Sequence, residues 1–538
     1  MTFPPSPIPS FLRRNLSPRQ LRGIAAGLVL AVVLLAPLGG LTWQTAALLS
    51  SDAQAAQGLL NERTARLWVQ SIAYGTAVAV GGVLLAVLAA SALWQIPGRT
   101  QQRLRWFFLV LAPLPSGLHA LAWISAAGWI GTLMPPAGIQ QLSYRGWGWL
   151  IWVQIMALAP LAVGLALLGL QRLPGELWDA ARLVSSPWKA FWRIAIPQSA
   201  PYLLAAGGLL FLLSLTDFYL PATFQVNVYA FEIFTEFSAS NNPGRAFLIS
   251  LPLCAATLPV ALFTGGQLRR ILATSTPQQK VQPQFLWPVG WELLQKSALF
   301  ILLLQVSVPV VVLLLTAGPP LAFLQSVAAA GRELFITSQI SLLAALAGLP
   351  LALLAADLLE TKGPVATGSW IALAFLLALP ASLTGIGLIV IWNRPGWPVY
   401  GTLLMPLLAL LVRWTPYAVI VLVAQKRRID PGLLEAERVF HTGWLKSWLR
   451  VRLPLLSPGL LASAFLMIAL SMGELGATLL VLPPGMETLA IRLYNYLHYG
   501  AAQTVSALSL LTALAGVALG LAVVWCFEIL SPARKPKP

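Results

Sequence analysis

Twelve long apolar runs occupy most of this 538-residue chain and limit it to one broad class of fold. A helix needs about 20 mostly apolar residues to cross a hydrocarbon core about 30 Å thick, and each run provides that length. None shows the strict alternation of a lipid-facing strand, so we expect an all-α integral membrane protein with about twelve transmembrane helices. The runs are 23–43, 68–93, 106–128, 147–170, 199–220, 246–267, 297–316, 335–356, 368–392, 400–424, 455–480 and 502–526.

The composition agrees with a membrane protein, since 58% of the residues are hydrophobic and 9% are charged. The two cysteines, Cys254 and Cys526, fall inside predicted spans and far apart, so we expect neither a disulfide framework nor a cysteine metal site. His119 and His441 have no partner at ligand spacing. We therefore predict no metal site.

The net charge of +17 would suit a nucleic-acid-binding protein, but the basic residues are distributed differently. With the N-terminus in the cytoplasm and twelve crossings, 26 of the 34 Lys and Arg residues lie on the cytoplasmic side and seven on the outer side. Arg413 remains inside a span. This bias follows the positive-inside rule, so we expect both termini in the cytoplasm, a lipid bilayer around the chain and no nucleic-acid partner. We also expect the first span to be retained rather than cleaved.

The two halves of the chain match each other at a shift of 257 to 267 residues. Leu114-Pro115-Ser116 corresponds to Leu379-Pro380-Ala381, and Asp217 corresponds to Glu474. Each half has six spans, so both halves should insert in the same orientation, as parallel six-helix repeats with a pathway between them. One chain would then supply both halves of a pore. The predicted parts are a cytoplasmic N-terminal segment 1–22, a first repeat 23–267, a cytoplasmic linker 268–296, a second repeat 297–526 and a cytoplasmic tail 527–538.

A polar, basic segment recurs between the fourth and fifth spans of each half. Each copy begins with Pro-Gly, and Pro174 and Pro431 each precede a second proline, Pro197 or Pro454, by 23 residues. The first part of each copy has the spacing of a short helix, and a second amphipathic piece leads to the closing proline. A single copy could be an ordinary basic hairpin at the membrane surface. Two copies at matched positions instead predict two equivalent docking sites for a soluble partner.

In these two segments the chain resembles the transmembrane subunits of bacterial ABC importers that work with a binding protein. Their signature is Glu-Ala-Ala, three residues, Gly, nine residues, then Ile-x-Leu-Pro. The second copy, from Glu435-Ala436-Glu437 to Pro454, fits this spacing. The first copy, from Asp179-Ala180-Ala181 to Pro197, is one residue short. Neither copy has the central Gly, so we expect a turn that differs from the family's.

The resemblance implies a fold like that of type I ABC importers and a place in the bacterial inner membrane. It also implies two partners, a cytoplasmic ABC ATPase in two copies and a periplasmic substrate-binding protein. The sequence contains no Gly-x-x-x-x-Gly-Lys-Ser/Thr phosphate loop, so we expect a transport subunit that is not an enzyme and holds no cofactor, with ATP bound by the partner. The implied coupling residues are Asp179, Ala180, Ala181, Pro197, Glu435, Ala436, Glu437 and Pro454.

The fusion of both halves into one chain is similar to the ferric-iron and thiamine importers of this superfamily. The segment Gly473–Thr478, followed by Pro483-Pro484-Gly485, is more similar to the iron branch. We therefore expect ferric iron as the substrate, with thiamine or another small solute as the alternative. An ion-coupled secondary transporter is the alternative of another class, because parallel six-span halves occur there too.

Charged side chains inside a membrane are costly and often functional. Asp217 and Glu474 each lie 16 residues after a proline of the fifth span, Pro201 or Pro458, which is about 24 Å along a helix. The two acids could line the outer mouth of a cation pathway, or each could accept hydrogen bonds from the end of a neighbouring helix. Arg413 could belong to the same pathway, pair inside the bundle or reach toward the membrane surface.

Two predicted outer segments, Phe231–Arg245 and Met486–Tyr499, carry further charges. Glu232, Arg245, Glu487 and Arg492 are candidates for docking a binding protein, although ordinary solvation would explain them equally well.

Overall fold

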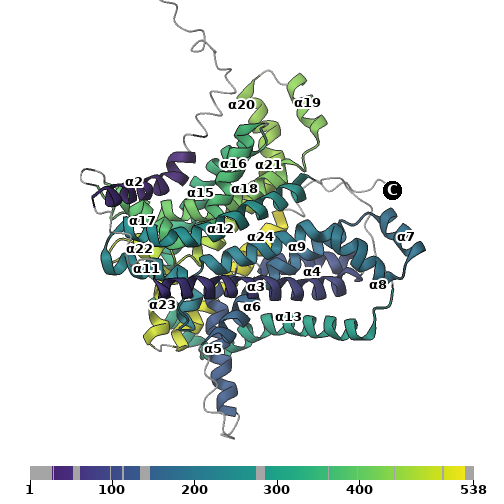
Figure 1. Cartoon of the computed structure of the whole chain (residues 1–538), viewed down its shortest axis with the longest axis horizontal. Coiled ribbons are helices and arrows are strands. Elements are labelled where there is room, and N and C mark those ends of the chain that lie inside the picture. The colour runs from purple at the N-terminus through teal and green to yellow at the C-terminus, as the bar shows by residue number, and fades with distance from the viewer. Residues whose placement is uncertain are drawn as a thin grey trace, which may run out of the picture.

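The computed structural model of this protein describes residues 27, 30–51, 61–96, 98–111, 114–133, 146–273, 285–361, 363–394, 396, 398–440, 443–499 and 502–526. All of the secondary structure in these residues is helical (Figure 1). The predicted segment 1–22 and tail 527–538 lie outside the described residues, as does His441. The predicted linker 268–296 is helical at both ends, because α12 continues to Ala273 and α13 begins at Val289, while 274–284 also lie outside the described residues.

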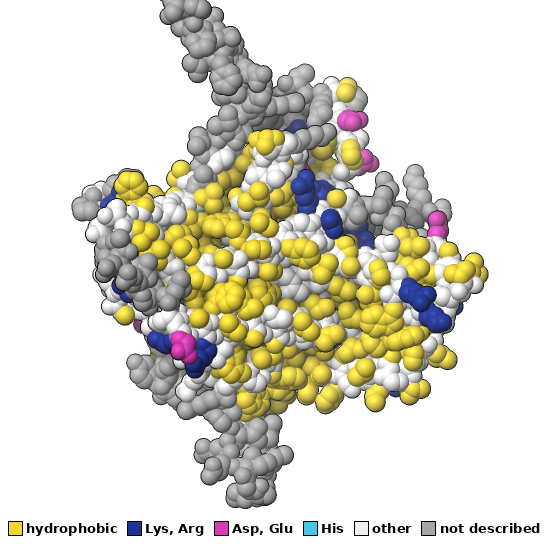
Figure 2. Space-filling model, viewed as in Figure 1, with side chains coloured by type: hydrophobic (Ala, Val, Ile, Leu, Met, Phe, Trp, Pro, Cys, Tyr) yellow, Lys and Arg dark blue, Asp and Glu magenta, His cyan; other side chains and the backbone are white. Residues whose placement is uncertain are grey.

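Ten helical stretches in the described part of the chain are long and apolar enough to cross a membrane. Their outward faces are apolar, and Figure 2 shows an almost continuous hydrophobic surface over one side of the molecule. The prediction of an all-α membrane protein is therefore confirmed. The stretches contain α2 (Ala36–Ser51), α3 (Glu62–Trp94), α6 (Trp147–Gln171), α9 (Ile196–Thr216), α12 (Pro243–Ala273), α13 (Val289–Thr316), α15 (Gly331–Leu359), α18 (Leu404–Lys426), α21 (Leu453–Met472) and α24 (Ala502–Trp525), and the π-turn η2 (Ala31–Leu35) leads into α2.

The third predicted span of each half is broken into two helices. The pairs are α4 (Gly98–Leu111) with α5 (Ser116–Leu133), and α16 (Pro364–Ala378) with α17 (Ala381–Trp392). Pro115 and Pro380 stand immediately before the second helix of each pair, where a missing N–H is tolerated and helix continuation from the preceding turn is not. The second pair bends by 106°. In the described residues, ten of the twelve expected spans are single long apolar helices, and an eleventh is counted if α16 and α17 form one bent span. The expected span that contains α4 and α5 includes residues 112–113, which lie outside the described residues.

The remaining helices are short and lie between the long helices along the sequence. Two groups occupy opposite ends of the bundle in Figure 1, with α7 and α8 at one end and α11, α22 and α23 at the other. They are α7 (Gly175–Val184), α8 (Pro187–Ala190), η3 (Phe191–Ala195), α10 (Tyr219–Thr223), α11 (Tyr229–Ser240), α14 (Pro320–Ala329), α19 (Pro431–Phe440), α20 (Trp444–Ser447), η4 (Trp448–Arg452), α22 (Thr478–Val481) and α23 (Leu489–Tyr499).

The repeated basic segments form the two-part helical units that their spacing predicts. In each, a ten-residue helix (α7 or α19) is followed by a short helix and a π-turn (η3 or η4) that continues into the next long helix. Pro197 and Pro454 lie directly after these π-turns. A proline lacks the N–H of a helical hydrogen bond and its ring crowds the carbonyl four residues earlier, so a local widening of the helix relieves the strain.

The first span of each half packs on helices of both halves. α2 contacts α12 and α17, whereas α13 contacts α24, α5 and also α3. Helices of the two halves meet again where α12 packs on α16 and α24 packs on α4. Two three-helix cores lie behind these contacts, one of α3, α6 and α9 and one of α15, α18 and α21. The long helices therefore form one interlocked bundle rather than two separate domains.

The contact between α24 and α4 depends on a glycine. A Cβ added at Gly520 would lie 2.7 Å from the carbonyl oxygen and 2.9 Å from the Cα of Val110. Small residues at such positions allow helix backbones to approach closely in a membrane. At Gly266, on α12, an added Cβ would meet no atom within 4 Å.

We predict that Gly520→Ala destabilises the protein and that Gly266→Ala does not. Alanine improves intrinsic helix propensity by about 1 kcal/mol at either position. At Gly520 the new methyl group meets backbone atoms, and such overpacking costs about 1–3 kcal/mol. Thermal unfolding in detergent should therefore show a lower Tm for Gly520→Ala alone. Equal Tm values for the two variants would contradict the observed packing of α24 on α4.

Candidate functional site

Three charged side chains come together where the two halves of the chain meet. Asp217 follows the last residue of α9, Glu474 lies two residues beyond α21, and Arg413 is in the middle of α18. Nε of Arg413 lies 3.4 Å from Oε2 of Glu474, and the charges of both residues act on the carboxylate of Asp217. We call these three residues the charged triad. It unites all three candidates that the sequence proposed for a pathway.

Each acid of the triad also caps a short helix. Oδ1 of Asp217 accepts hydrogen bonds from the backbone N–H groups of Tyr219 at 2.8 Å and Leu220 at 3.5 Å, at the start of α10. Oε1 of Glu474 accepts from the N–H of Ala477 at 2.9 Å, just ahead of α22. Carboxylates at such positions satisfy free N–H groups and interact favourably with the helix dipole. Each acid therefore accepts hydrogen bonds at a helix end, while the alternative in which the two acids line the outer mouth of a cation pathway stays a prediction.

Arg413 is paired inside the bundle. Besides Glu474, its guanidinium reaches the carbonyl oxygen of Leu379, with Nη1 at 3.4 Å, and lies 5.1 Å from the ring centroid of Trp414. Its side chain is 20% exposed, whereas that of Glu474 is 4% exposed. Arg413 stands three residues before Pro416, and the matching position before Pro160 of α6 is Ala157. Arg413 thus pairs with Glu474, and the matching position of the first half provides no cation.

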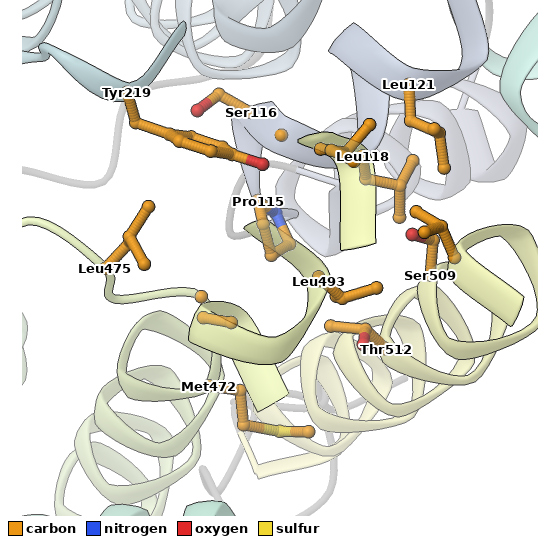
Figure 3. Close-up of a pocket in the computed structure, with 15 residues that line it drawn as sticks. Pro115, Ser116, Leu118, Leu121, Tyr219, Met472, Leu475, Leu493, Ser509 and Thr512 are labelled. Atoms are coloured by element: carbon orange, nitrogen blue, oxygen red, sulfur yellow. The ribbon is translucent and has the colours of Figure 1, made fainter. Parts of the chain in front are cut away.

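A cavity adjoins the triad and is lined by both halves of the chain (Figure 3). It encloses about 550 Å³ of empty space, part of which is open to solvent. Its lining is apolar with a few hydroxyl groups and no charged side chain. The residues labelled in Figure 3 are Pro115, Ser116, Leu118, Leu121 and Tyr219 from the first half, and Met472, Leu475, Leu493, Ser509 and Thr512 from the second.

Two glycines bring the walls of this cavity close together. A Cβ added at Gly117 would lie 2.4 Å from Cε1 of Tyr219, and one added at Gly473 would lie 2.7 Å from Cγ of Pro115. Gly117 therefore allows the Tyr219 ring to lie flat against α5. Tyr219 is two residues from Asp217, and Gly473 is next to Glu474, so the same short turns build the cavity and the triad. Sequence reasoning missed this cavity, because only the packed structure brings α5, α10 and α24 together.

The two repeated units present the same outward face. Asp179 and Ala180 on α7 are exposed, as are Glu435 and Ala436 on α19. The third position of each triplet, Ala181 or Glu437, is buried. Pro197 and Pro454 are both exposed at the starts of the long helices that follow. In Figure 1, α19 projects from the bundle, whereas α7 lies against its end.

The side chain of Glu437 points into its own unit and not toward the outer surface that a partner protein would contact. Nε of Arg452 donates to its two carboxylate oxygens at 2.7 and 3.0 Å, and the Ser447 hydroxyl donates to Oε1. The Glu437 side chain is 2% exposed. This contact holds α19 to η4. The sequence analysis did not identify the roles of Ser447 and Arg452. An acid at the third position, where the signature has Ala, was the available signal.

Three of the four docking candidates at the other end of the bundle form ion pairs within the chain. Glu232 pairs with Arg63 at 2.9 Å, Arg245 with Glu236 at 2.7 Å, and Arg492 with Glu333 at 2.6 Å. These pairs hold α11 to α3 and α12, and α23 to α15. Glu487 is exposed and forms no ion pair with any described residue.

The same two helices, α11 and α23, are also anchored by matching hydroxyl groups. The Ser71 hydroxyl accepts from the N–H of Tyr229, and the Thr337 hydroxyl accepts from the N–H of Leu489, each at 2.8 Å. Burial, together with the charge of Glu232, raises the pKa of Tyr229 to about 12, so this phenol stays neutral at physiological pH. Both helices are therefore fixed to the bundle by their first residues.

Residues 348–536 match the family described as "Binding-protein-dependent transport system inner membrane component". A Salmonella typhimurium (strain LT2) protein, provisionally named 2-aminoethylphosphonate transport system permease protein PhnV, is 30% identical over 145 residues, which are 25% of this chain and 52% of that protein. The putrescine transport system permease protein PotI of Escherichia coli (strain K12) is 26% identical over 139 residues, 25% of this chain and 50% of that protein. The chain thus spans about half the length of the curated relatives it matches. For the matched part, the prediction of a transport component rather than an enzyme is confirmed.

We predict that Arg413→Met destabilises the protein much more than Arg413→Met combined with Glu474→Gln. Removal of Arg413 alone leaves a buried carboxylate without its cation, which costs about 3–5 kcal/mol. In the double variant the charge is gone, while the Gln oxygen can still accept from the Ala477 N–H. Thermal unfolding of both single variants and the double variant gives their coupling energy. If the two single effects simply add, Arg413 and Glu474 do not form a stabilising pair.

Proposed function

We propose that this chain is the membrane-spanning permease subunit of an ATP-driven importer, located in a bacterial inner membrane. The two repeated helical units, α7–η3 and α19–η4, carry this proposal. The second unit lies inside the part of the chain that matches binding-protein-dependent transport components. Each unit continues directly into a long helix, so a push on its exposed helix is transmitted to a membrane span.

The partner of these units is a cytoplasmic ATPase of the ABC type in two copies. Asp179 and Glu435 supply an exposed acid at the same place, and Leu183 and Val439 supply an apolar side chain that is 88% and 76% exposed. Apolar groups this exposed on a water-facing helix are typical of a contact surface. Because the outward faces of the two units have the same chemistry, each fits one copy of the same partner. ATP is bound and hydrolysed there, and this chain holds no cofactor.

One chain supplies both halves of the pathway. The packing supports two repeats, 23–267 and 297–526, joined by the linker 268–296. The first helix of the first repeat, α2, contacts α12 and α17, and the first helix of the second repeat, α13, contacts the corresponding helices α24 and α5. Parallel repeats of this kind place a pathway at their interface, where the charged triad and the cavity lie. Closure and opening of the two docked ATPases would rock the two halves about this interface.

The units α7–η3 and α19–η4 mark the cytoplasmic end of the bundle. Arg182, Lys189 and Arg193 lie in the first unit, and Lys446, Arg450 and Arg452 lie in the second, as the positive-inside rule requires. Both termini are then cytoplasmic, because in this proposal α4 with α5 and α16 with α17 each cross the membrane once as a pair of helices. The opposite end, with α11 and α23, would receive a periplasmic substrate-binding protein. Glu487 is the strongest contact candidate there, since Glu232, Arg245 and Arg492 already hold these helices in place.

The substrate is a small solute that carries a positive charge. Two acids and one Arg give the triad a net negative charge, which favours a cation at the interface of the halves. Ferric iron, which the sequence suggests, and an amine such as the putrescine named for PotI both meet this condition, whereas the 2-aminoethylphosphonate named for PhnV carries at least as much negative as positive charge. No group of three or more His, Cys, Asp or Glu in the described residues is placed to hold a metal ion. The amine is therefore the better supported of the two.

Charge reversal on the exposed faces of the two units tests the proposed function. The tagged chain is purified in mild detergent from its own cells, and the proteins that remain bound are identified and assayed for ATP hydrolysis. We predict that an ABC ATPase is recovered with the unaltered chain. In the variant with both Asp179→Arg and Glu435→Arg, the recovery of the ATPase should fall at least about tenfold. Charges of like sign would then face each other at the contact between this chain and the ATPase, which costs several kcal/mol.

The matched control is Glu292→Arg, which reverses an exposed acid outside both units. This variant should retain the ATPase. Recovery of no ATPase with the unaltered chain, together with transport driven by an ion gradient, would replace this proposal with a secondary transporter.

A further inference from the structure

An aromatic cluster joins the first repeated unit to the start of the second half of the chain. Trp178 lies on α7, and Trp188 and Phe191 lie on α8 and η3. Residues about 100 positions later in the sequence pack against them. The members are Trp94 at the end of α3, Trp178, Trp188, Phe191, Phe285, Trp287 and Trp291, and we call this set the aromatic clamp.

The rings of the clamp are in direct contact and mostly edge to face. The Phe191 and Trp287 centroids are 4.9 Å apart, those of Phe285 and Trp287 are 4.5 Å apart, and those of Trp188 and Trp291 are 5.2 Å apart. Such tilted and perpendicular arrangements are the favoured geometries of aromatic pairs. Trp178 and Phe191 are 1% and 0% exposed. The clamp is therefore a packed core at the base of the unit and not a surface belt of separate rings.

Hydrogen bonds fix the same segment to α3. Nε2 of Gln95 donates to the carbonyl oxygen of Phe285 at 2.8 Å. Gln295 on α13 is buried. With its amide oxygen turned toward the two indoles, it accepts from Nε1 of Trp287 and of Trp291 at 3.2 Å each, and this oxygen lies 2.8 Å from the Ser91 hydroxyl oxygen on α3. A single side chain thereby joins α3, α13 and both tryptophans.

We propose that Trp287 and Trp291 are positioning residues that lock the first repeated unit to α13, so that the two move as one body. This inference rests on the proposed function, in which the unit receives the movement of an ATPase. α13 runs from the clamp to the neighbourhood of the cavity, where Leu313 packs with Leu118 and Leu121 of the cavity wall. A displacement of α7 is then carried along α13 to the cavity, although α13 belongs to the other half of the sequence.

The second unit is held by a different contact. The position that matches Trp178 is Leu434, and the unit is fixed by the ion pair of Glu437 and Arg452. At the end of α15, in the place of Trp94, Glu360 pairs with Lys426 of α18 at 2.7 Å. Two units with the same outward face are thus attached through unlike inner contacts. The clamp couples α13 to the first unit specifically.

Distances between spin labels test the clamp in the isolated full-length chain, without an ATPase. With Cys254 and Cys526 replaced by Ala, labels are placed at Leu183 on α7 and Leu303 on α13, which are 88% and 61% exposed. We predict one narrow distance distribution for this background. In the variant with Trp287→Ala and Trp291→Ala, the width of the distance distribution should grow at least about twofold, because the first repeated unit and α13 then move independently. An unchanged width at an unchanged Tm would overturn the proposal.

Two further variants separate positioning from a general loss of structure. Leu286→Ala alters the neighbouring side chain, which is 96% exposed, and should leave the distribution unchanged. Trp287→Phe combined with Trp291→Phe keeps aromatic packing and should restore a narrow distribution, even if the Ala variant folds poorly. Gln295→Leu removes the group that accepts hydrogen bonds from the two indoles. If the distance distribution of the Phe variant is as broad as that of Gln295→Leu, with Tm maintained, a packing role for the rings is also contradicted.

Labels in the ATPase complex distinguish this inference from the proposed function. The labels on the two units are moved to Lys189 on α8 and Lys446 on α20, which are exposed and lie outside the docking residues Asp179, Leu183, Glu435 and Val439. When ATP is trapped, the distance from Lys189 to Leu303 should stay constant while the distance from Lys446 to Leu303 changes. If no ATPase binds the unaltered chain, the proposed function fails, but the clamp is still tested by the isolated protein. If the ATPase binds and both distances change equally, the clamp proposal fails and the proposed function stands.

Discussion

Hydrocarbon offers no partner for a backbone hydrogen bond, and the fold of this chain follows from that constraint. Long helices satisfy their own N–H and C=O groups, so each uninterrupted apolar run becomes a span. Wherever a helix ends within the bundle, the protein must supply the missing partners. Asp217 and Glu474 do so for α10 and α22, and the same two carboxylates form the charged triad with Arg413. The helix ends after α9 and α21 and the candidate site are therefore one feature, since the groups that accept hydrogen bonds there are also the charges at the interface of the halves.

The sequence predicts those parts of the fold that depend on local periodicity. Run length locates the long helices, and the repeated Pro-Gly segments locate α7 and α19, because helix spacing and proline chemistry act over a few residues. The sequence did not show that Pro115 and Pro380 divide the third run of each half into two helices, because the average hydropathy of these runs is still high. For the site, the sequence supplied the three charges but not their partners. The contacts of Glu437 with Arg452, and of Phe191 with Trp287, join residues whose proximity only tertiary packing creates.

The two halves are alike where they face outward and unlike where they face each other. Asp179 and Glu435 present equivalent surfaces, whereas Trp178 and Leu434 lead to different anchors. Arg413 has Ala157 as its counterpart, so the cation that pairs with Glu474 comes from the second half alone. Identical partners require identical docking faces, but a pathway formed by one fused chain is free to become asymmetric inside. The cavity shows the consequence, since its wall combines Tyr219 of one half with Ser509 and Thr512 of the other.

We propose that a single chain with two repeated units forms the entire membrane part of an ATP-driven importer. Native mass spectrometry of the complex, released from lipid nanodiscs, counts its subunits. We predict a particle that contains one copy of this chain and two copies of an ABC ATPase. A particle with two copies of this chain for every two ATPases would contradict it, because each chain would then supply only half of the pathway.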